Sequence, residues 1–417
     1  MTAVATAVAL LIAGMPPANA AWAEEWWLPR LDVNKAWTVS KGAGVTVAVV
    51  DTGVVDKLGD LSGRVLPGVN LVGGGDGRSD PGDGCNESGG CYSHGTQMAL
   101  LIAGTAAGQG FQGIAPAAKI LPVKVISRTG LDADDGPIAQ GVKWSVDHGA
   151  KIVSISLGTS GSCPDEVGAA IKYAYQHDVI VVAGSGNDSS PVMGNIAACP
   201  GALAVGATNP QFTRASFSNY GPQLAFVDPG TPNVQETLSG AKLPGGDNSG
   251  GTSDATAIAA ATLALIRSHF PHMSARDVVT HALYNVHNGL GKFGVRISDQ
   301  LGYGEILPYH AMADALPAGA SNPIYDQWAK ELGPPTPGGG SSGSSAAPSS
   351  GSDEQPSSEP ASGGGQANGS SGSGSSGIPV GVIILIVVVV IAAGVSVAVV
   401  VRRSKRSSTV GGYPPPR

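Results

Sequence analysis

The sequence predicts an α/β fold with a doubly wound, mainly parallel β-sheet and helices on both faces. Short runs rich in β-branched residues recur along the chain, and stretches with helical periodicity lie between them. Most of the runs are continuously apolar, which is typical of strands that are buried on both faces of a parallel sheet. Strands that alternate with helices imply crossover connections, and such sheets carry their sites at the carboxyl ends of the strands.

The individual elements follow from these two patterns. Five runs are expected to form strands: residues 45–50, 120–125, 152–155, 179–182 and 203–205. Four stretches with apolar residues at helical spacing are expected to form helices: residues 97–107, 137–148, 166–177 and 253–269. Strand and helix alternate strictly from residue 45 to residue 182, as a series of crossover units requires.

Composition limits what the folded part can be. The chain has 417 residues and a net charge of −7, from 31 acidic and 24 basic residues, which argues against a nucleic-acid-binding protein because such a protein would show a basic face. Much of the Gly and Pro lies after residue 332. Residues 333–377 are Gly, Ser and Pro with a few acids, and they cannot bury enough apolar surface to fold. We therefore expect one folded domain followed by a disordered linker.

Both ends of the chain predict a location outside the cytoplasm. Residues 1–20 are expected to be a signal peptide, because the apolar run 4–14 is followed by the A-x-A cleavage pattern Ala18-Asn19-Ala20. Residues 378–401 form an uncharged apolar stretch that is long enough to span a bilayer. Basic residues follow this stretch, and cationic residues stay on the cytoplasmic side. The expected protein is a single-pass protein of the cell membrane with a cytoplasmic tail, residues 402–417.

Three short motifs lie at the end of a predicted strand or at the start of a predicted helix. They are Asp51-Thr52-Gly53, His94-Gly95-Thr96 and Gly250-Gly251-Thr252-Ser253. Taken singly, each motif has another explanation: half of an aspartic protease site or a turn, a surface histidine, and a helix N-cap. The order Asp, His, Ser along the chain is, however, one of the known orders of a catalytic triad.

Together these residues predict nucleophilic catalysis. Ser253 would attack, His94 would take its proton, and Asp51 would hold the imidazole in the required tautomer. Asn187 follows the predicted strand 179–182, and its side-chain amide could donate to a tetrahedral oxyanion beside the backbone amide of Ser253. The four residues are expected to form one site.

On these motifs the chain resembles the subtilisin-like serine proteases over roughly residues 31–313. The resemblance is carried by residues 48–54, 93–96, 154–158, 181–187, 228–230 and 251–253. It implies a seven-stranded, mainly parallel sheet and endopeptidase activity, with Asp51, His94 and Ser253 as the triad and Asn187 as the oxyanion donor. No cofactor is expected and no residue is assigned to a metal ion, although acidic loops in subtilases sometimes hold calcium.

The same resemblance suggests how substrate is bound. Ser156, Leu157 and Gly158 match the edge segment that pairs with a substrate strand through main-chain hydrogen bonds. Ala183, Gly184 and Ser185 would line the first specificity pocket together with Gly158. Because these walls are small, the pocket is expected to accept apolar or small side chains.

A narrower resemblance is to the mycosins, the membrane-tethered subtilases of actinobacterial type VII secretion. It is carried by residues 27–31, residues 37–44 and Gly302-Tyr303-Gly304, and by the predicted linker, span and basic tail. It implies the following organisation: signal peptide 1–20, N-terminal extension 21–44, protease domain 45–332, linker 333–377, transmembrane helix 378–401 and cytoplasmic tail. It also implies protein or peptide substrates and association with a secretion machine. The alternative function is a structural subunit of a secretion complex with weak or dispensable proteolysis.

The sequence departs from the family pattern just after Ser253. Subtilisin-like proteases have a bulky apolar residue, two small residues and Pro at this point, whereas this chain has Asp254, Ala255, Thr256 and Ala257. A carboxylate that pointed inward would oppose the developing oxyanion. Asp254 is therefore expected to point to solvent, where it favours the helix N-terminus.

The four cysteines are expected to form disulfides, because the predicted compartment is oxidising. Three connectivities are possible. The pairs Cys85–Cys91 and Cys163–Cys199 are favoured, and free buried thiols at Cys163 and Cys199 are the alternative. Neither pair has zinc-site spacing. The acidic loops around Asp76–Asp83 and Asp132–Asp135 are read as solvated loops, since their spacing is not that of a helix–loop–helix calcium site.

Overall fold

The computed structural model describes most of the predicted folded domain. The described residues are 25–78, 94–107, 111–126, 134–158, 160–230, 235–236, 242–243, 250–290 and 294–335. The chain divides into two units, residues 1–344 and 345–417, and every described residue belongs to the first unit. The predicted signal peptide, the predicted span 378–401 and the predicted cytoplasmic tail lie outside the described residues, as do Cys85 and Cys91. Among the helices that are described, none has the length and apolar character needed to cross a membrane.

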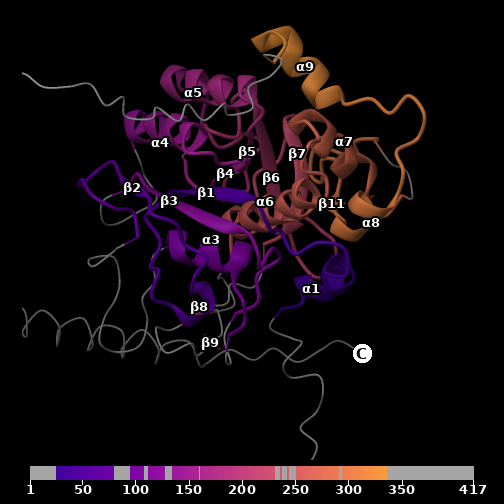
Figure 1. Ribbon diagram of the computed structural model, residues 1–417. Helices are drawn as coiled ribbons and strands as arrows, with labels where there is room; N and C mark the ends of the chain where they lie inside the picture. Colours follow the sequence, from indigo (N-terminus) through magenta and orange to yellow (C-terminus); the bar gives the residue numbers. More distant parts are fainter. Residues whose placement is uncertain are drawn as a thin grey trace, which may run out of the picture. The chain divides into compact units, whose positions relative to one another are not determined.

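The first unit is organised around a seven-stranded parallel sheet with the strand order β2-β3-β1-β4-β5-β6-β7 (Figure 1). The strands are β1 (Thr46–Asp51), β2 (Val69–Asn70), β3 (Lys119–Lys124), β4 (Ile152–Ile155), β5 (Ile180–Gly184), β6 (Ala202–Thr208) and β7 (Leu224–Pro229). Strands β2 and β3 lie on one side of β1, and β4 to β7 lie on the other. The order of the strands thus reverses at β1, and such a reversal opens a crevice at the carboxyl ends of the strands.

Helices cover both faces of this sheet, which confirms the predicted architecture. Helices α4 (Asp135–Asp147) and α5 (Asp165–Gln176) lie on one face, and α3 (His94–Ala103) and α6 (Thr252–His269) on the other (Figure 1). Alternate residues of β1 serve the two faces, because Ala48 packs in the apolar cluster of α4 and α5 whereas Val47 packs in that of α3 and α6. Since both faces are buried, the strands are continuously apolar.

Helix α6 is the central helix of its face. Every residue from Thr252 to Arg267 is buried, and the helix contacts β1, β4, β5, β6 and β7 as well as α3, α7 and α8. Small residues are frequent in it, with Ala at six of its eighteen positions. A helix surrounded in this way has no exposed face along that stretch.

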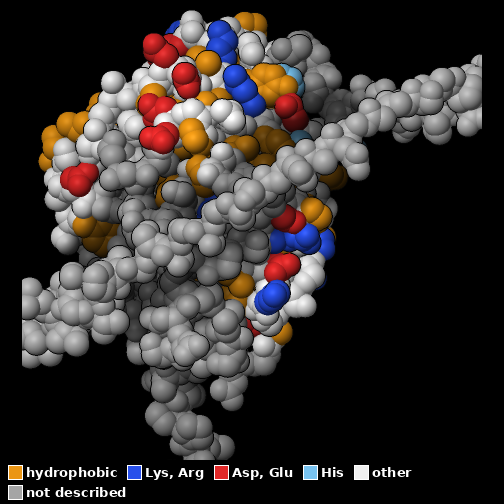
Figure 2. All heavy atoms as spheres, turned by 90° about the vertical axis from the view of Figure 1, so that its left-hand side faces the viewer, with side chains coloured by type: hydrophobic (Ala, Val, Ile, Leu, Met, Phe, Trp, Pro, Cys, Tyr) orange, Lys and Arg blue, Asp and Glu red, His pale blue; other side chains and the backbone are white. Residues whose placement is uncertain are grey.

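The remaining elements surround this framework. They are α1 (Trp27–Arg30), α2 (Val33–Ala36), a 3₁₀ helix (Gly59–Leu61), α7 (Ala275–Tyr284), α8 (Pro308–Ala313), α9 (Pro323–Leu332), and the antiparallel pairs β8 (Gln235–Glu236) with β9 (Lys242–Leu243) and β10 (Val286–His287) with β11 (Glu305–Ile306). On the face shown in Figure 2, basic and acidic side chains of the described residues are interspersed.

The segment that precedes β1 is held against the rest of the unit by buried contacts. The Trp27 ring stacks on Phe111 with 5.7 Å between ring centroids. Arg30 Nε donates to Glu305 Oε2 at 2.8 Å, and the Glu305 side chain is fully buried. Residues 25–44, which fall within the predicted N-terminal extension, therefore contribute to the packed core.

The elements predicted from the sequence correspond to β1, β3, β4, β5 and β6 and to α3, α4, α5 and α6. Every predicted end lies within four residues of the observed end. Strands β2 and β7 and the helices outside α3 to α6 were not predicted.

Candidate active site

The carboxyl end of β1 and the start of α3 bring Asp51 and His94 together. Asp51 is the last residue of β1 and is fully buried, and His94 is the first residue of α3. His94 Nδ1 lies 2.9 Å from Asp51 Oδ1 and 2.8 Å from Oδ2. A carboxylate only accepts hydrogen bonds, so Nδ1 carries the proton, and Nε2 of the neutral ring is left as an acceptor.

The neighbouring backbone fixes this arrangement. Thr52 N donates to Asp51 Oδ1 at 2.7 Å, and Gly95 N donates to Thr52 Oγ1 at 2.9 Å. A Cβ atom at Gly95 would clash with the carbonyl oxygen of Gly53 and would lie 3.0 Å from Asp51 Cβ. The helix can therefore approach the end of the strand this closely only with glycine after His94.

The electrostatic surroundings favour the protonated form of His94. Burial alone would lower the pKa of His94, but the charge of Asp51 and the hydrogen bond to it, with a smaller contribution from Asp254, raise that pKa above its usual value. An imidazolium is thus stabilised at this position, as a base that takes up a proton requires.

Ser253 lies at the start of α6, next to the residue that follows β4. Its Oγ donates to Ser156 O at 3.3 Å, and Ser156 Oγ donates to Ser253 O at 3.1 Å. His94 and Ser253 are both in the described part of the chain, and no hydrogen bond joins them there. Helix α3 packs against α6, so the two residues start helices that are in contact. The Ser253 hydroxyl can take three staggered directions, and catalytic hydrogen bonds are often long before substrate binds. The missing hydrogen bond therefore does not exclude His94 as the base for Ser253.

Asn187 is oriented by the residue that precedes Ser253. Thr252 N and Thr252 Oγ1 lie 2.9 and 3.1 Å from Asn187 Oδ1. A backbone N–H can only donate, so the oxygen of the amide must face Thr252. The Nδ2 group is left to donate elsewhere, and it has no acceptor among the described residues. This is the orientation that an oxyanion donor needs.

A pocket of about 660 Å³ lies beside these residues. Three segments line it: Ser156, Leu157, Gly158 and Ser160 after β4; Gly184, Gly186, Asn187, Asp188 and Ser190 from β5 and the loop after it; and Thr252 and Ser253. Of the residues predicted to bind substrate, Ser156, Leu157, Gly158 and Gly184 line the pocket. Ala183 and Ser185 do not, because both side chains are fully buried. Ala183 packs in the cluster between the sheet and α4 and α5, and Ser185 Oγ donates to Asn219 O at 3.0 Å.

The family follows from the sequence as a whole. Residues 42–304 match the family model of the subtilase family. The chain belongs to this family. Among the proteins that it is similar to are alkaline elastase YaB from Bacillus sp. (strain YaB), at 38% identity over 251 residues, and M-protease from Shouchella clausii (strain KSM-K16), at 36% identity over 250 residues. Each alignment covers 60% of this chain, and the chain spans about 60% of the length of both relatives.

A solved structure extends the comparison to the mycosins. The chain is similar to the MycP3 protease from the type VII (ESX-3) secretion system, with a TM-score of 0.61 and 27% identity. The superposition covers 72% of this chain and 90% of the MycP3 chain. The subtilisin-like fold and the resemblance to the mycosins are thereby confirmed.

Asp254, where this subtilase departs from the family pattern, does not point to solvent. The residue is only 5% exposed, and its Oδ2 atom has no hydrogen-bond partner within the described residues. Burial raises its pKa to about 7, although the positive charge of His94 opposes the rise. The expectation of a solvent-facing carboxylate is wrong because α6 is buried on every side from Thr252 to Arg267.

Sequence reasoning also missed residues that shape the loop after β5. Asn219 is fully buried, and its Oδ1 accepts from the backbone N–H groups of Asp188 and Ser190, both at 2.9 Å. Asn219 Nδ2 donates to Val192 O at 3.0 Å. Residues that are distant along the chain thus hold one wall of the pocket. In the sequence, the one sign of this wall is the polar loop that follows Asn187.

One predicted disulfide is confirmed. Cys163 and Cys199 are joined by an S–S bond of 2.00 Å. The described ranges contain no group of three or more His, Cys, Asp or Glu side chains that could hold a metal ion. In the first acidic loop, Asp76 forms an ion pair with Arg78 at 2.7 Å, while Asp80, Asp83 and Asp132 lie outside the described residues.

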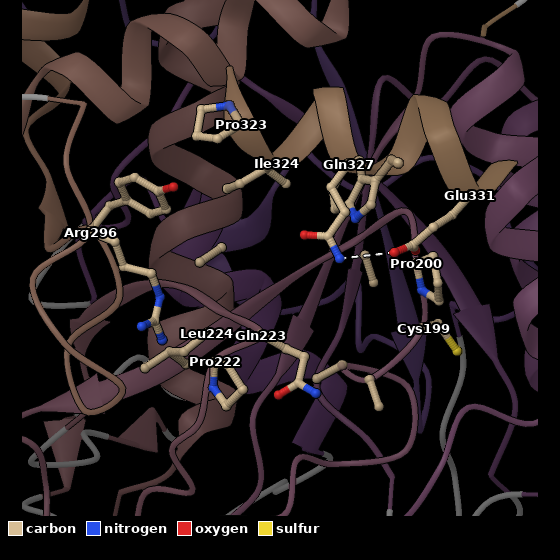
Figure 3. A pocket seen from close by; sticks show the side chains of 16 residues that line it. Cys199, Pro200, Pro222, Gln223, Leu224, Arg296, Pro323, Ile324, Gln327 and Glu331 are labelled. Carbon is tan, nitrogen blue, oxygen red and sulfur yellow. Dashed lines mark hydrogen bonds between the residues drawn. The ribbon is translucent and has the colours of Figure 1, made fainter. Parts of the chain in front are cut away.

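A second pocket of about 340 Å³ shares no lining residue with the pocket at Ser253 (Figure 3). Helix α9 forms one wall through Ile324, Gln327 and Glu331, and Arg296 and Gln223 contribute polar groups on other sides. The Gln327 Nε2 group donates to Glu331 Oε1 at 2.9 Å, so two of the polar groups satisfy each other. Among the described residues that line it, Glu331 carries the one carboxyl group, and no histidine is present.

Proposed function

We propose that this subtilase is a serine endopeptidase that cleaves peptide bonds in proteins or peptides. The observation that carries the proposal is the pair of contacts between His94 Nδ1 and the Asp51 carboxylate at the carboxyl end of β1. Ser253 lies in the first turn of α6, the helix that packs against α3. The match to the subtilase family supports the same reaction.

Each residue has a role in the proposed reaction. Ser253 Oγ attacks the carbonyl carbon of the substrate while His94 Nε2 takes the hydroxyl proton, and Asp51 stabilises the imidazolium. Asn187 Nδ2 and the backbone N–H of Ser253 donate to the oxyanion of the tetrahedral intermediate. His94 then gives the proton to the leaving amine, and water attacks the acyl-enzyme by the same route. Residues 156–158 pair with the substrate backbone as an added strand.

Replacement of the nucleophile tests this reaction. The full chain with Ser253→Ala should lose nearly all hydrolysis of a denatured protein substrate. Ser216→Ala, at an exposed serine of a loop that does not line the pocket, is the matched control and should keep the wild-type rate. A purified Ser253→Ala protein that still cleaves at the wild-type rate would refute the assignment.

We further propose that the enzyme acts outside the cytoplasm, anchored by residues 378–401, and works with a type VII secretion machine. Support comes from the predicted signal peptide and span and from the similarity to MycP3, a protease of such a system. An epitope tag is placed after Arg417, and the outer layers of the cell envelope are permeabilised while the cytoplasmic membrane stays intact. Protease added to these cells should remove the folded domain and spare the tag. Loss of the tag together with the domain would contradict this orientation.

The second candidate is a structural subunit of a secretion complex. Two observations favour it: Asp254 is a buried carboxyl beside Ser253, and the Ser253 hydroxyl donates to Ser156 O rather than to His94. Complementation separates the two functions. If the Ser253→Ala chain restores secretion to a strain that lacks the protein, the structural function stands. If only the wild-type chain restores it, proteolysis is required.

A further inference from the structure

The pocket beside Ser253 has a distinctive charge. Of the described residues that line it, Asp188 alone is charged, and the others are serines, glycines, one Thr, one Asn and one Leu. Asp188 forms no ion pair with any described residue. The pocket therefore presents a carboxylate that no basic side chain in the described part of the chain neutralises.

This carboxylate is held in place at the pocket wall. Ser160 Oγ, from the opposite segment of the lining, donates to Asp188 Oδ2 at 2.6 Å. The backbone N–H of Asp188 donates to Asn219 Oδ1 at 2.9 Å, and Asn219 Nδ2 lies 3.5 Å from Asp188 Oδ2. Asn219 is fully buried, so the loop is fixed from within the domain.

The backbone before Asp188 adds to this restraint. Gly186 has a φ of +105°, and a Cβ atom there would clash with the Asn219 side chain. Only glycine combines this conformation with this close approach. The position of Asp188 is thus set by buried neighbours, even though its own side chain is exposed at the mouth of the pocket.

We propose that Asp188 makes this pocket select substrates in which the residue entering it is Lys or Arg. The inference rests on the proposed endopeptidase function and names its substrate class. A volume of about 660 Å³ accommodates a long basic side chain. The cationic end of that side chain would meet Asp188 Oδ1 and Oδ2, while its methylene stem would lie along Leu157 and the glycines. The expectation of small or apolar side chains followed from the small walls alone and did not include Asp188.

The exposure of Asp188 limits the size of the effect. Ion pairs between exposed groups are weak, so the preference for Lys over an uncharged residue of similar length should fall by about two- to fivefold when the carboxylate is removed. Because added salt screens exposed charges, the wild-type preference should also shrink between low and high ionic strength.

The test compares peptides that differ only in the residue before the cleaved bond: Lys, Arg, norleucine and Glu. The full chain, Asp188→Asn, Asp188→Lys and the control Glu166→Gln, at an exposed carboxylate of α5, are assayed for kcat/KM and for labelling of Ser253 by a fluorophosphonate. The wild type and the control should prefer Lys and Arg. Asp188→Asn should lose that preference by two- to fivefold, and Asp188→Lys should favour Glu.

Two failures are distinguishable. If Ser253 is labelled and peptides are cleaved, but the Lys to norleucine ratio is the same in wild type and Asp188→Asn and does not respond to salt, this inference is overturned and the endopeptidase function stands. If no peptide is cleaved and no variant is labelled, the proposed function fails, and the inference fails with it. The salt dependence of the wild type decides the matter even if an Asp188 variant does not fold.

Discussion

Replacement of Asp254 by Asn tests what a buried carboxyl group beside Ser253 does to the stability of this subtilase. Asp254 is 5% exposed, and burial raises its pKa from 3.8 to about 7. Asn has nearly the same shape and cannot ionise. Because Oδ2 has no hydrogen-bond partner among the described residues, the substitution removes no hydrogen bond at that atom.

The magnitude follows from the two pKa values. A raised pKa means that the folded chain holds the proton more tightly than the unfolded chain, so ionisation of Asp254 opposes folding. At about 1.4 kcal/mol for each tenfold change in the dissociation constant, the ionised group lowers the free energy of unfolding by about 4 kcal/mol. This loss is absent below about pH 4, grows between about pH 4 and pH 7, and is constant above that range.

The assay is urea unfolding of the full chain from pH 4 to pH 9, with Ser253→Ala in both proteins so that self-cleavage does not interfere. Asp254→Asn should exceed its parent in stability by about 4 kcal/mol at pH 8, and the difference should close toward pH 4. Asp228 and Glu305, whose pKa values burial also raises, are common to both proteins and cancel in the difference. A difference that does not change with pH would refute the assignment of a buried Asp254 with a raised pKa.

Three further predictions concern separate parts of the molecule. Arg30→Ala should lower the free energy of unfolding by about 3 kcal/mol in chemical denaturation, because it leaves the buried Glu305 carboxylate without its cation; a change below 1 kcal/mol would contradict this. The double substitution of Cys163 and Cys199 by Ser should lower stability by about 4 kcal/mol, as expected for the loss of a cross-link over 36 residues, and an unchanged melting temperature would count against it. Asn187→Ala should lower kcat by about 10²- to 10³-fold with little change in KM, and an effect confined to KM would exclude a role for its amide in stabilising the oxyanion.

The sequence predicted the framework well because the central strands are buried on both faces. Continuous apolar runs that alternate with helices are compatible with few other folds. The predicted bounds of β4, residues 152 and 155, are also its observed bounds. Strand β2 has only two residues, and α1 and α2 have four each, so they are too short for a periodic signal. The start of α7 does have a recognisable sequence signal, because Ser274 is its N-cap and accepts from Asp277 N.

The site was predicted less completely, since side-chain directions depend on packing. Asp51, His94 and Ser253 each belong to a short motif at the end of a strand or the start of a helix, and such motifs can be recognised from the sequence alone. The burial of Asp254 depends instead on the elements that surround α6 in space. The role of Asp188 depends on Asn219, which lies 31 residues away along the chain and fixes the loop that carries it.

The most direct test of the central claim is to label the full chain with a fluorophosphonate and map the modified residue. A competent site of Asp51, His94 and Ser253 predicts modification of Ser253 in the wild type and its loss in His94→Ala, although Asp254 is buried beside the nucleophile. If a demonstrably folded wild-type chain is not labelled, or if labelling of Ser253 persists without His94, the proposed catalytic site is contradicted.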